Sequence, residues 1–437
     1  MLKKLLFLAL ALSFANMLFS QGLAEGWKFS GHSQIRGELD SKDFNFQSPM
    51  NSFTLMKTRL GVEKTFENNF KFFVQMQDSR VWGMEGATLT DTKNVDLHQG
   101  YVEMGNLFNS DFSLTVGRKE ISYGSQRVIG PNGWNNVSRA FDGVNVKYKS
   151  EGFWIDAFRY TINAQNNLAV GYPYTSKMDV TYSLYGLWAN IAMSPKTKLD
   201  VYGLYDADLT KVGVDNKYEK YTAGVTYWGN YGELSTTVDA IYQGGTYTAA
   251  ANTPLDISAY LITFKLQYDA KPFTTSIHAD IHSGTSAEEI AKGKDAKYQI
   301  FDAPHGSKHI FYGGMDYFNT SANNMVEYGL MDIYLRLIHK EADSPFSAQL
   351  DAHYFMSQNP YTIAGEEKSD LGIEFDLLLN YQVAKGIGFE LGNCVMLPGE
   401  VTKNINYVNV NDKNTPKFWN ISDDIGYFGY LMLRANF

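Results

Sequence analysis

The chain has 437 residues, a formal net charge of −9 and a single cysteine, Cys394. The acidic balance argues against a nucleic-acid partner, and a lone cysteine excludes an internal disulfide. Aromatic residues make up 15% of the sequence, with 29 tyrosines, whereas prolines number only 11. This composition favours β-strands with aromatic side chains over helices or disorder.

The first residues predict a secretory signal peptide. Lys3 and Lys4 precede an apolar run that is too short for a comfortable membrane span, and cleavage sites are available after Ser20 or Ala24. We therefore expect residues 1–24 to be removed and residues 25–437 to form one domain. After this segment no run reaches eighteen apolar residues, so the sequence excludes helical membrane spans.

Apolar and polar residues alternate through the rest of the chain. In residues 27–39, Trp27, Phe29 and Ile35 share one phase, while the other phase is wholly polar and includes Arg36 and Glu38. Such alternation is typical of antiparallel strands whose two faces meet different environments. The predicted strands are residues 27–39, 53–65, 70–76, 97–108, 111–122, 140–149, 152–163, 182–193, 198–207, 218–229, 233–243, 258–268, 273–282, 325–340, 346–358, 371–383, 387–397 and 425–437.

Short and long connections alternate between these strands. The predicted turns near residues 68, 110, 150, 195, 231, 270, 343 and 385 are short, and the long loops are 83–95, 124–136, 164–181, 208–217, 244–257, 283–324 and 398–424. A soluble sandwich would share the alternating side chains, but this alternation of loop lengths is typical of outer-membrane barrels. We predict an all-β fold, a single 18-stranded antiparallel transmembrane β-barrel with short periplasmic turns and long extracellular loops. We expect it in the outer membrane of a Gram-negative bacterium.

The most distinctive segment lies between residues 114 and 148, where a turn-rich loop joins two alternating strands. Its pattern consists of Gly117, Arg118, Tyr123, Gly124, Arg127, Gly130, Trp134, Asn136, Arg139, Phe141, Asp142, Gly143 and Val144. These residues resemble the signature of the alginate-export family of outer-membrane β-barrels. The resemblance implies a channel for passive passage of hydrophilic, anionic solutes or a polysaccharide. It also implies that the terminal aromatic residue, Phe437, is recognised by the barrel assembly machinery.

Arginines in the polar phases are candidates for lining such a channel. Strands near the two chain ends, which barrel closure would bring together, carry several of them, and the motif loop adds more. A basic wall would attract carboxylates or phosphates, because guanidinium binds both in bidentate fashion. The predicted pore-lining or substrate-binding residues are Arg36, Lys57, Arg59, Arg118, Arg127, Trp134, Arg139, Asp142, Arg336 and Arg434.

An alternative accompanies this prediction. Acidic residues concentrate on later strands, so opposed basic and acidic walls are equally expected of a general porin without anion preference.

The placement of single residues also leaves alternatives. Arg118 shares its phase with Leu114 and Val116, so its place in the lumen requires a bulge or a strand end. Trp134 and Tyr123 suit sugar stacking, but anchoring of the loop against the barrel wall is the more common use of loop aromatics.

An enzymatic role finds little support in the sequence. His278 and His282 are four residues apart on one strand, too far to share a tetrahedral metal ion, and no nucleophile motif frames Ser283. A barrel hydrolase and a structural barrel plugged by its loops stay as alternatives. We expect no catalytic residues, no cofactor and no metal. The expected partners are outer-membrane lipid and lipopolysaccharide, the assembly machinery, and an anionic or neutral saccharide solute, with no nucleic acid and a monomeric barrel.

Overall fold

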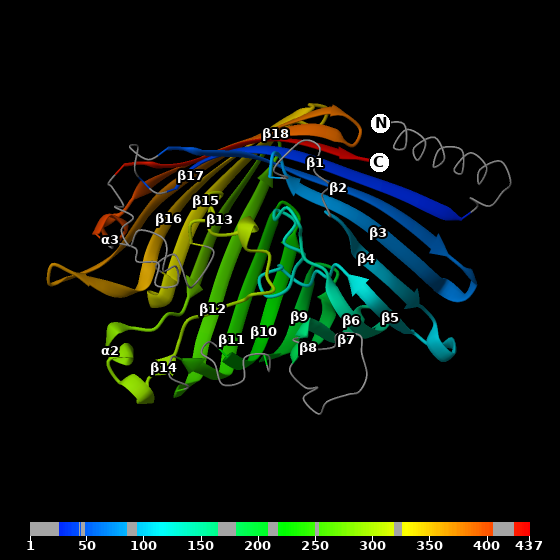
Figure 1. Cartoon of the computed structure of the whole chain (residues 1–437), viewed down its shortest axis with the longest axis horizontal. Coiled ribbons are helices and arrows are strands. Elements are labelled where there is room, and N and C mark those ends of the chain that lie inside the picture. The colour runs from blue at the N-terminus through cyan, green and yellow to red at the C-terminus, as the bar shows by residue number, and fades with distance from the viewer. Residues whose placement is uncertain are drawn as a thin grey trace.

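The computed structural model describes residues 26–42, 44, 49–84, 94–164, 181–208, 217–249, 253–318, 326–404 and 424–437. The predicted signal peptide lies outside these residues. Eighteen antiparallel strands form a closed barrel, and a nineteenth, the two-residue β14, pairs in parallel with β12 (Figure 1). The strands are β1 (Trp27–Ser41), β2 (Asn51–Thr65), β3 (Phe70–Val81), β4 (Val95–Met104), β5 (Phe112–Lys119), β6 (Phe141–Ser150), β7 (Phe153–Ala164), β8 (Thr181–Ser194), β9 (Thr197–Asp208), β10 (Lys217–Tyr231), β11 (Leu234–Ala249), β12 (Thr253–Ala270), β13 (Phe273–His282), β14 (Lys297–Tyr298), β15 (Leu330–Lys340), β16 (Phe346–Ile363), β17 (Glu366–Ala384), β18 (Ile387–Pro398) and β19 (Gly426–Asn436). The short helices include α2 (Ala287–Ile290) and α3 (Glu400–Asn404).

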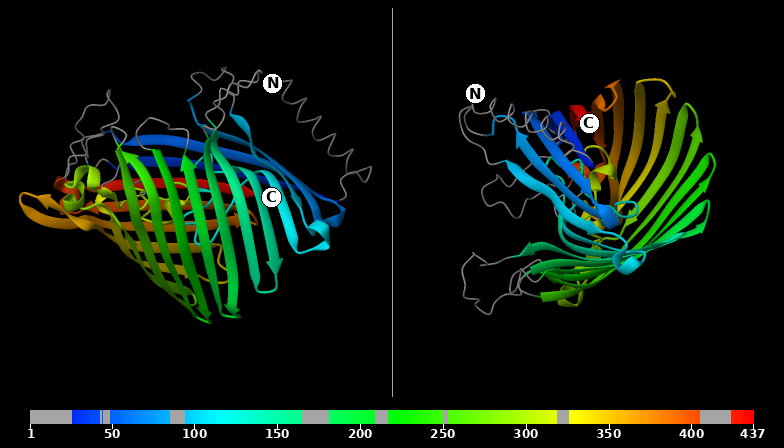
Figure 2. Two further views of the ribbon diagram at one scale, coloured as in Figure 1. Left: turned by 90° about the horizontal axis from the view of Figure 1, so that it is seen from below. Right: turned by 90° about the vertical axis from the view of Figure 1, so that its right-hand side faces the viewer.

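The two ends of the chain meet to close the barrel. β1 pairs with β2 on one edge and with β19 on the other, and the tilted strands wrap around a common axis (Figure 2). Beyond the last paired residues, the Phe437 N–H donates to Gly31 O at 3.1 Å and the Gly31 N–H donates to Phe437 O at 2.9 Å. Each described strand of the barrel therefore pairs with a neighbour on both sides, as a hydrocarbon environment requires.

The alternation predicted from the sequence separates two faces of the barrel. In β15, Ile333, Leu335 and Leu337 are exposed on the outer face, whereas Asp332 and Tyr334 are buried inside. Apolar side chains on the outer face suit contact with lipid. Buried polar side chains on the inner face show that the interior is occupied by other parts of the protein.

The predicted strands and short turns are confirmed, with differences at some strand ends. β13 has the predicted bounds. The predicted loop 244–257 is wrong over most of its length, because β11 continues to Ala249 and β12 begins at Thr253. Residues 246–248 are threonine and tyrosine, good strand formers, and they pair with residues 254–256 of β12. β15 begins at Leu330, five residues later than predicted, after a 3-10 turn at residues 326–328.

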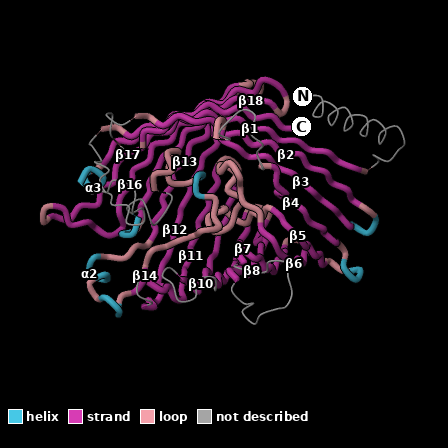
Figure 3. Tube along the Cα trace, viewed as in Figure 1, coloured by secondary structure: helices cyan, strands magenta, loops and turns pink. Residues whose placement is uncertain are grey.

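Two connecting segments turn into the barrel interior (Figure 3). The first loop, residues 120–140, joins β5 to β6, and the second loop, residues 299–318, follows α2 and β14. Ile129 of the first loop and Met315 of the second are buried in two apolar clusters that also include inward side chains of the strands. Within the described residues, no helix is long and apolar enough to cross a membrane.

Candidate functional site: the lumen and its two inward loops

The first loop is held on one side by basic side chains of β1 and β2. Lys57 Nζ donates to Gly133 O at 3.0 Å and to Asn135 O at 3.2 Å. Arg36 Nη1 donates to Trp134 O at 2.9 Å, and Arg59 Nη1 donates to the Glu120 carboxylate at 3.0 Å. The cations of this wall therefore satisfy backbone carbonyls and a carboxylate of the loop.

The same loop reaches acidic side chains on the opposite strands. The Tyr123 hydroxyl donates to Asp156 Oδ2 at 2.7 Å, and the Ser125 hydroxyl donates to Asp239 Oδ1 at 3.2 Å.

Arg127 forms a buried bidentate ion pair with Asp280, with 3.0 Å between Nη2 and Oδ1. Burial works to lower the pKa of the Arg127 guanidinium, but the neighbouring Asp280 outweighs it and raises that pKa, so the arginine stays charged. The first loop thus spans the bore, with its carbonyls on the basic wall and its donors on the acidic wall.

Two aromatic residues anchor the first loop by stacking. Tyr123 stacks on Phe158 and on Trp188, with ring centroids 5.4 and 5.2 Å apart. The Trp134 ring stacks on His309, with centroids 3.7 Å apart, and Arg36 Cζ lies 3.5 Å from the Trp134 ring centroid. Because the imidazole and the guanidinium cannot occupy the same space, they cover opposite faces of Trp134. The interpretation of both aromatics as anchors fits this packing better than sugar stacking does.

The second loop is anchored on the wall formed by β8 to β11. His305 Nε2 lies 2.6 Å from Asp206 Oδ1 and 3.0 Å from the Tyr182 hydroxyl. Lys220 Nζ donates to Asp302 O at 2.9 Å. Burial works to raise the pKa of the Asp302 carboxyl, but Lys220 and Lys308 outweigh it and lower that pKa.

The second loop also reaches β17 on the far side of the bore. The Gly314 N–H donates to Asp376 Oδ2 at 2.8 Å, and the Met315 N–H donates to Glu374 Oε1 at 2.8 Å. Like the first loop, the second therefore crosses the interior between two walls.

Arg139 joins the two loops. Its Nη1 donates to Gly130 O at 3.0 Å, to His305 O at 2.6 Å and to Gly306 O at 3.1 Å, and its Nη2 donates to Pro304 O at 2.9 Å. Burial lowers the pKa of the Arg139 guanidinium, and the neighbouring Tyr182 opposes this shift only in part.

Backbone contacts complete this junction. The Gly130 N–H donates to His305 O at 2.8 Å, and the Ser307 N–H donates to Gln126 O at 2.9 Å. Gly306 permits the approach, since a Cβ there would collide with Arg127 O. The two loops form one connected obstruction across the lumen.

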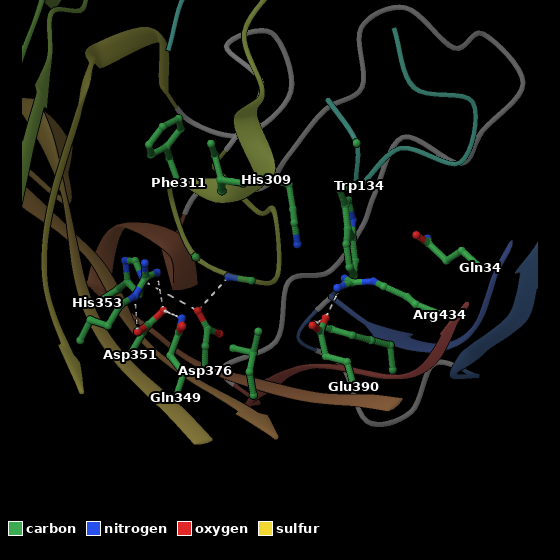
Figure 4. A pocket seen from close by; sticks show the side chains of 17 residues that line it. Gln34, Trp134, His309, Phe311, Gln349, Asp351, His353, Asp376, Glu390 and Arg434 are labelled. Carbon is green, nitrogen blue, oxygen red and sulfur yellow. Dashed lines mark hydrogen bonds and ion pairs between the residues drawn. The ribbon is translucent and has the colours of Figure 1, made fainter. Parts of the chain in front are cut away.

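A cavity of about 410 Å³ lies between the two loops and the strands β1 and β15 to β19 (Figure 4). Its walls include Trp134 and His309 above Arg434 and Glu390, with Asp351 on the other side. Arg434 is two residues from the end of β19, so the cavity lies towards the rim that carries the short turns. In barrels of this kind short turns face the periplasm.

Two arginines present their charge to this cavity. Arg336 holds Asp351 through Nε and Nη2, at 2.8 and 2.7 Å, and Arg434 Nη2 lies 3.2 Å from Glu390 Oε1. The side chains of Arg434 and Arg336 are 43% and 25% exposed, whereas those of Glu390 and Asp351 are only 12% and 4% exposed. Among the described residues, Arg336 Nη1 and the Nε and Nη1 of Arg434 have no hydrogen-bond partner. The two guanidinium groups are therefore more accessible from the cavity than the carboxylates with which they pair.

The structure divides the predicted site residues into three groups. Trp134, Arg336 and Arg434 line the cavity. Arg118 and Asp142 pair with each other at 2.5 Å, in phase with the exposed Val116 and Val144 of the outer face. Their prediction as lumen residues is corrected, because no bulge turns them inward. The remaining predicted residues lie in the lumen and anchor the first loop: Arg36, Lys57, Arg59, Arg127 and Arg139.

The inward course of the second loop was not predicted. Residues 283–324 were expected to form a long extracellular loop, yet within it His305 is buried against Asp206 and His309 pairs with Asp316 at 2.7 Å. The sequence does contain an indication of this inward course in Phe301, Phe311 and Tyr312, because a loop this rich in aromatic residues needs a surface to pack on.

A closed antiparallel barrel with an apolar outer face, a polar inner face and loops folded into its bore defines a porin-like outer-membrane channel. The family described as Alginate export matches residues 27–333, well over half of the chain, and the protein belongs to this family. The family and the fold are those of transport channels and not of enzymes. No match was found among curated proteins.

Solved structures show the same barrel. The chain is similar to the crystal structure of Acinetobacter baumannii OccAB4, with 13% identity, 94% of this chain and 98% of that chain covered, and a TM-score of 0.57. It is also similar to Pseudomonas aeruginosa OccK11 (OpdR), with 14% identity, coverage of 94% and 95%, and a TM-score of 0.56. A BenF-like porin from Pseudomonas fluorescens Pf-5 shares 9% identity, with coverage of 94% and 98% and a TM-score of 0.56. At these identities the likeness concerns the fold alone.

Proposed function

We propose that the protein is a channel for passive passage of small, hydrophilic, anionic solutes, with carboxylate-bearing saccharides as the favoured class. It would act as a monomer in the outer membrane of a Gram-negative bacterium, surrounded by lipid and lipopolysaccharide, after removal of its signal peptide and insertion by the assembly machinery. The two inward loops restrict the bore, which favours small solutes over a thick polymer strand.

The observation that carries the anion preference is the exposure of Arg434 and Arg336 in front of their carboxylate partners. Their unpaired guanidinium nitrogens offer the donor geometry that a carboxylate accepts. A cavity of about 410 Å³ lies within the range of about 300–1,000 Å³ that small ligands occupy. Gln34, Gln349 and Tyr430 add neutral polar groups suited to hydroxyls.

A general porin without anion preference is the second candidate. Three carboxylates line the cavity, those of Asp351, Asp376 and Glu390, against two arginines. This balance favours weak selectivity if the acidic groups act on a solute as strongly as the more exposed arginines do.

Liposome swelling separates the two candidates. Glucuronate and glucose share a ring and differ in one carboxylate, so their relative rates report the contribution of that charge. We expect R434Q to slow glucuronate by up to about fivefold, the value of an ion pair worth about 0.2–1 kcal/mol, and to leave glucose unchanged. R118Q, which removes an arginine from the outer face, is the matched control and should change neither rate. Equal slowing of both sugars, or no effect of R434Q, would favour the general porin.

A further inference from the structure

A second group of side chains lies beside the cavity and shares only Asp376 with its walls. It consists of Glu374 and Asp376 on β17 and Cys394 on β18, where Asp376 and Cys394 are directly opposite each other in the sheet register. All three are buried, and one ligand atom from each lies within 4.8 Å of the others.

Two of the four carboxylate oxygens of Glu374 and Asp376 have no hydrogen-bond partner among the described residues. The second loop uses Asp376 Oδ2 and Glu374 Oε1, each of which accepts a backbone N–H at 2.8 Å. Asp376 Oδ1 and Glu374 Oε2 are buried and have no hydrogen-bond partner among the described residues. An unpaired buried polar atom is costly, and two on adjacent carboxylates require either a bound cation or a proton shared between them.

The neighbouring cations are engaged elsewhere. Arg336 forms a bidentate pair with Asp351, and His353 Nδ1 lies 2.9 Å from Asp332 Oδ1. His353 Nε2 is 3.7 Å from Asp376 Oδ2, which is beyond hydrogen-bond distance. Asp351, His353 and Asp376 also lie close enough together to hold a metal ion. Because Asp351 is already paired with Arg336 and His353 with Asp332, these three residues are a less favourable metal site.

We propose that Glu374, Asp376 and Cys394 form a binding site for a zinc ion. Zinc accepts one thiolate and two carboxylates in a tetrahedral arrangement, and the thiolate selects it over calcium or magnesium. Binding displaces the Cys394 thiol proton to solvent, and the two carboxylates with the thiolate compensate the ion's charge. Asp376 also lines the cavity, which provides an entry path and a place for a water as the fourth ligand.

The ion would also fix the second loop. Gly313 and Gly314 bring the loop backbone directly onto the group, since a Cβ on Gly313 would lie 2.6 Å from the Glu374 carboxylate and one on Gly314 would lie 2.6 Å from Cys394 Sγ. A metal that holds the free oxygens orients the same carboxylates that accept the Gly314 and Met315 N–H groups.

The test measures metal content of the purified, folded full-length barrel exposed to Zn²⁺ alone and then dialysed, with Cd²⁺ as a spectroscopic substitute. We expect one zinc per chain by elemental analysis and a thiolate-to-cadmium charge-transfer absorption. D376N and C394A should lose both, while D343N, in an exposed turn, should keep both. Heat-modifiable mobility on gels reports folding, and C394A removes only a buried sulfur, so it serves if D376N does not fold.

Two outcomes would overturn the proposal. A folded wild-type barrel that takes up no zinc and shows no cadmium absorption would mean that the two carboxylates share a proton instead. Equal uptake by wild type, D376N and C394A would place the ion elsewhere. Neither result depends on solute passage, so failure here is distinguishable from failure of the proposed channel function.

Discussion

Replacing Arg139 by methionine should loosen the obstruction in the lumen. The substitution keeps an unbranched apolar stem and removes the guanidinium that contacts four carbonyl groups across the two loops. Gly130 N–H, Ser307 N–H and the strand-bound anchors at Asp280 and Asp376 are unaffected, so the barrel itself should fold normally.

The structure gives the size of this effect. The four carbonyl contacts of Arg139 come from two nitrogen atoms, Nη1 and Nη2, and three of them share Nη1. We therefore count them as about two charge-assisted hydrogen bonds, each worth about 1.5–3 kcal/mol. Water entering the site recovers part of this free energy, which leaves a net loss of about 1.5–3 kcal/mol in docking of one loop on the other. At 1.4 kcal/mol per factor of ten, the ratio of undocked to docked loops should rise by about ten- to a hundredfold.

Single-channel recording in planar bilayers measures this ratio as the fraction of time spent in a state of higher conductance. R139M should increase that fraction, and R118M, which removes an arginine of the same motif from the outer face, should not. If R139M forms folded barrels with the conductance and open-state occupancy of the wild type, the junction role of Arg139 is wrong.

Three further predictions follow from the closure, the orientation and the anchoring of the barrel. Deleting Phe437 removes two backbone hydrogen bonds to Gly31 and should lower the yield of folded, heat-modifiable barrel, whereas an unchanged yield would show that the last residue does not help closure. A cysteine at Lys294, in the exposed turn after α2, should react with a membrane-impermeant label on intact cells and one at Ala270 should not, and the reverse result would invert the topology. Because the Asp302 pKa is lowered in the folded state, its stabilisation of the second loop is present above the ordinary carboxyl pKa of about 3.9 and is lost as pH falls through the lowered value. Channel flicker should therefore increase on strong acidification and D302N should reduce that change, while flicker that increases only towards alkaline pH would contradict this assignment.

The strands could be predicted because each one carries its own signal. In β13 the apolar phase with Ile277 and Ile281 and the polar phase with His278 and Asp280 define both faces without reference to any neighbour. Arg118 was nevertheless predicted to line the lumen although it shares its phase with Leu114 and Val116, and the structure places it on the outer face with them.

The contents of the lumen could not be predicted in the same way. Arg36, Arg59 and Arg139 were predicted to line the pore, whereas in the structure they contact backbone carbonyls and carboxylates up to 167 residues away. No local pattern in the sequence states that a loop turns inward to meet them. In the pairs Arg336–Asp351 and Arg434–Glu390 the arginine is more exposed than the carboxylate. This difference depends on the geometry between neighbouring strands, which the sequence alone does not contain.

We infer that the wild-type barrel is a channel whose bore is restricted by the first loop. The decisive experiment compares the single-channel conductance of the wild type with that of a variant in which residues 125–138 are replaced by a short glycine–serine linker. With folding verified by heat-modifiable mobility, we expect the wild type to conduct and the variant to show a several-fold larger conductance with weaker discrimination between glucuronate and glucose. Equal conductance of the two proteins would show that the first loop does not restrict the bore, and no conductance from either would show that the barrel is not a channel.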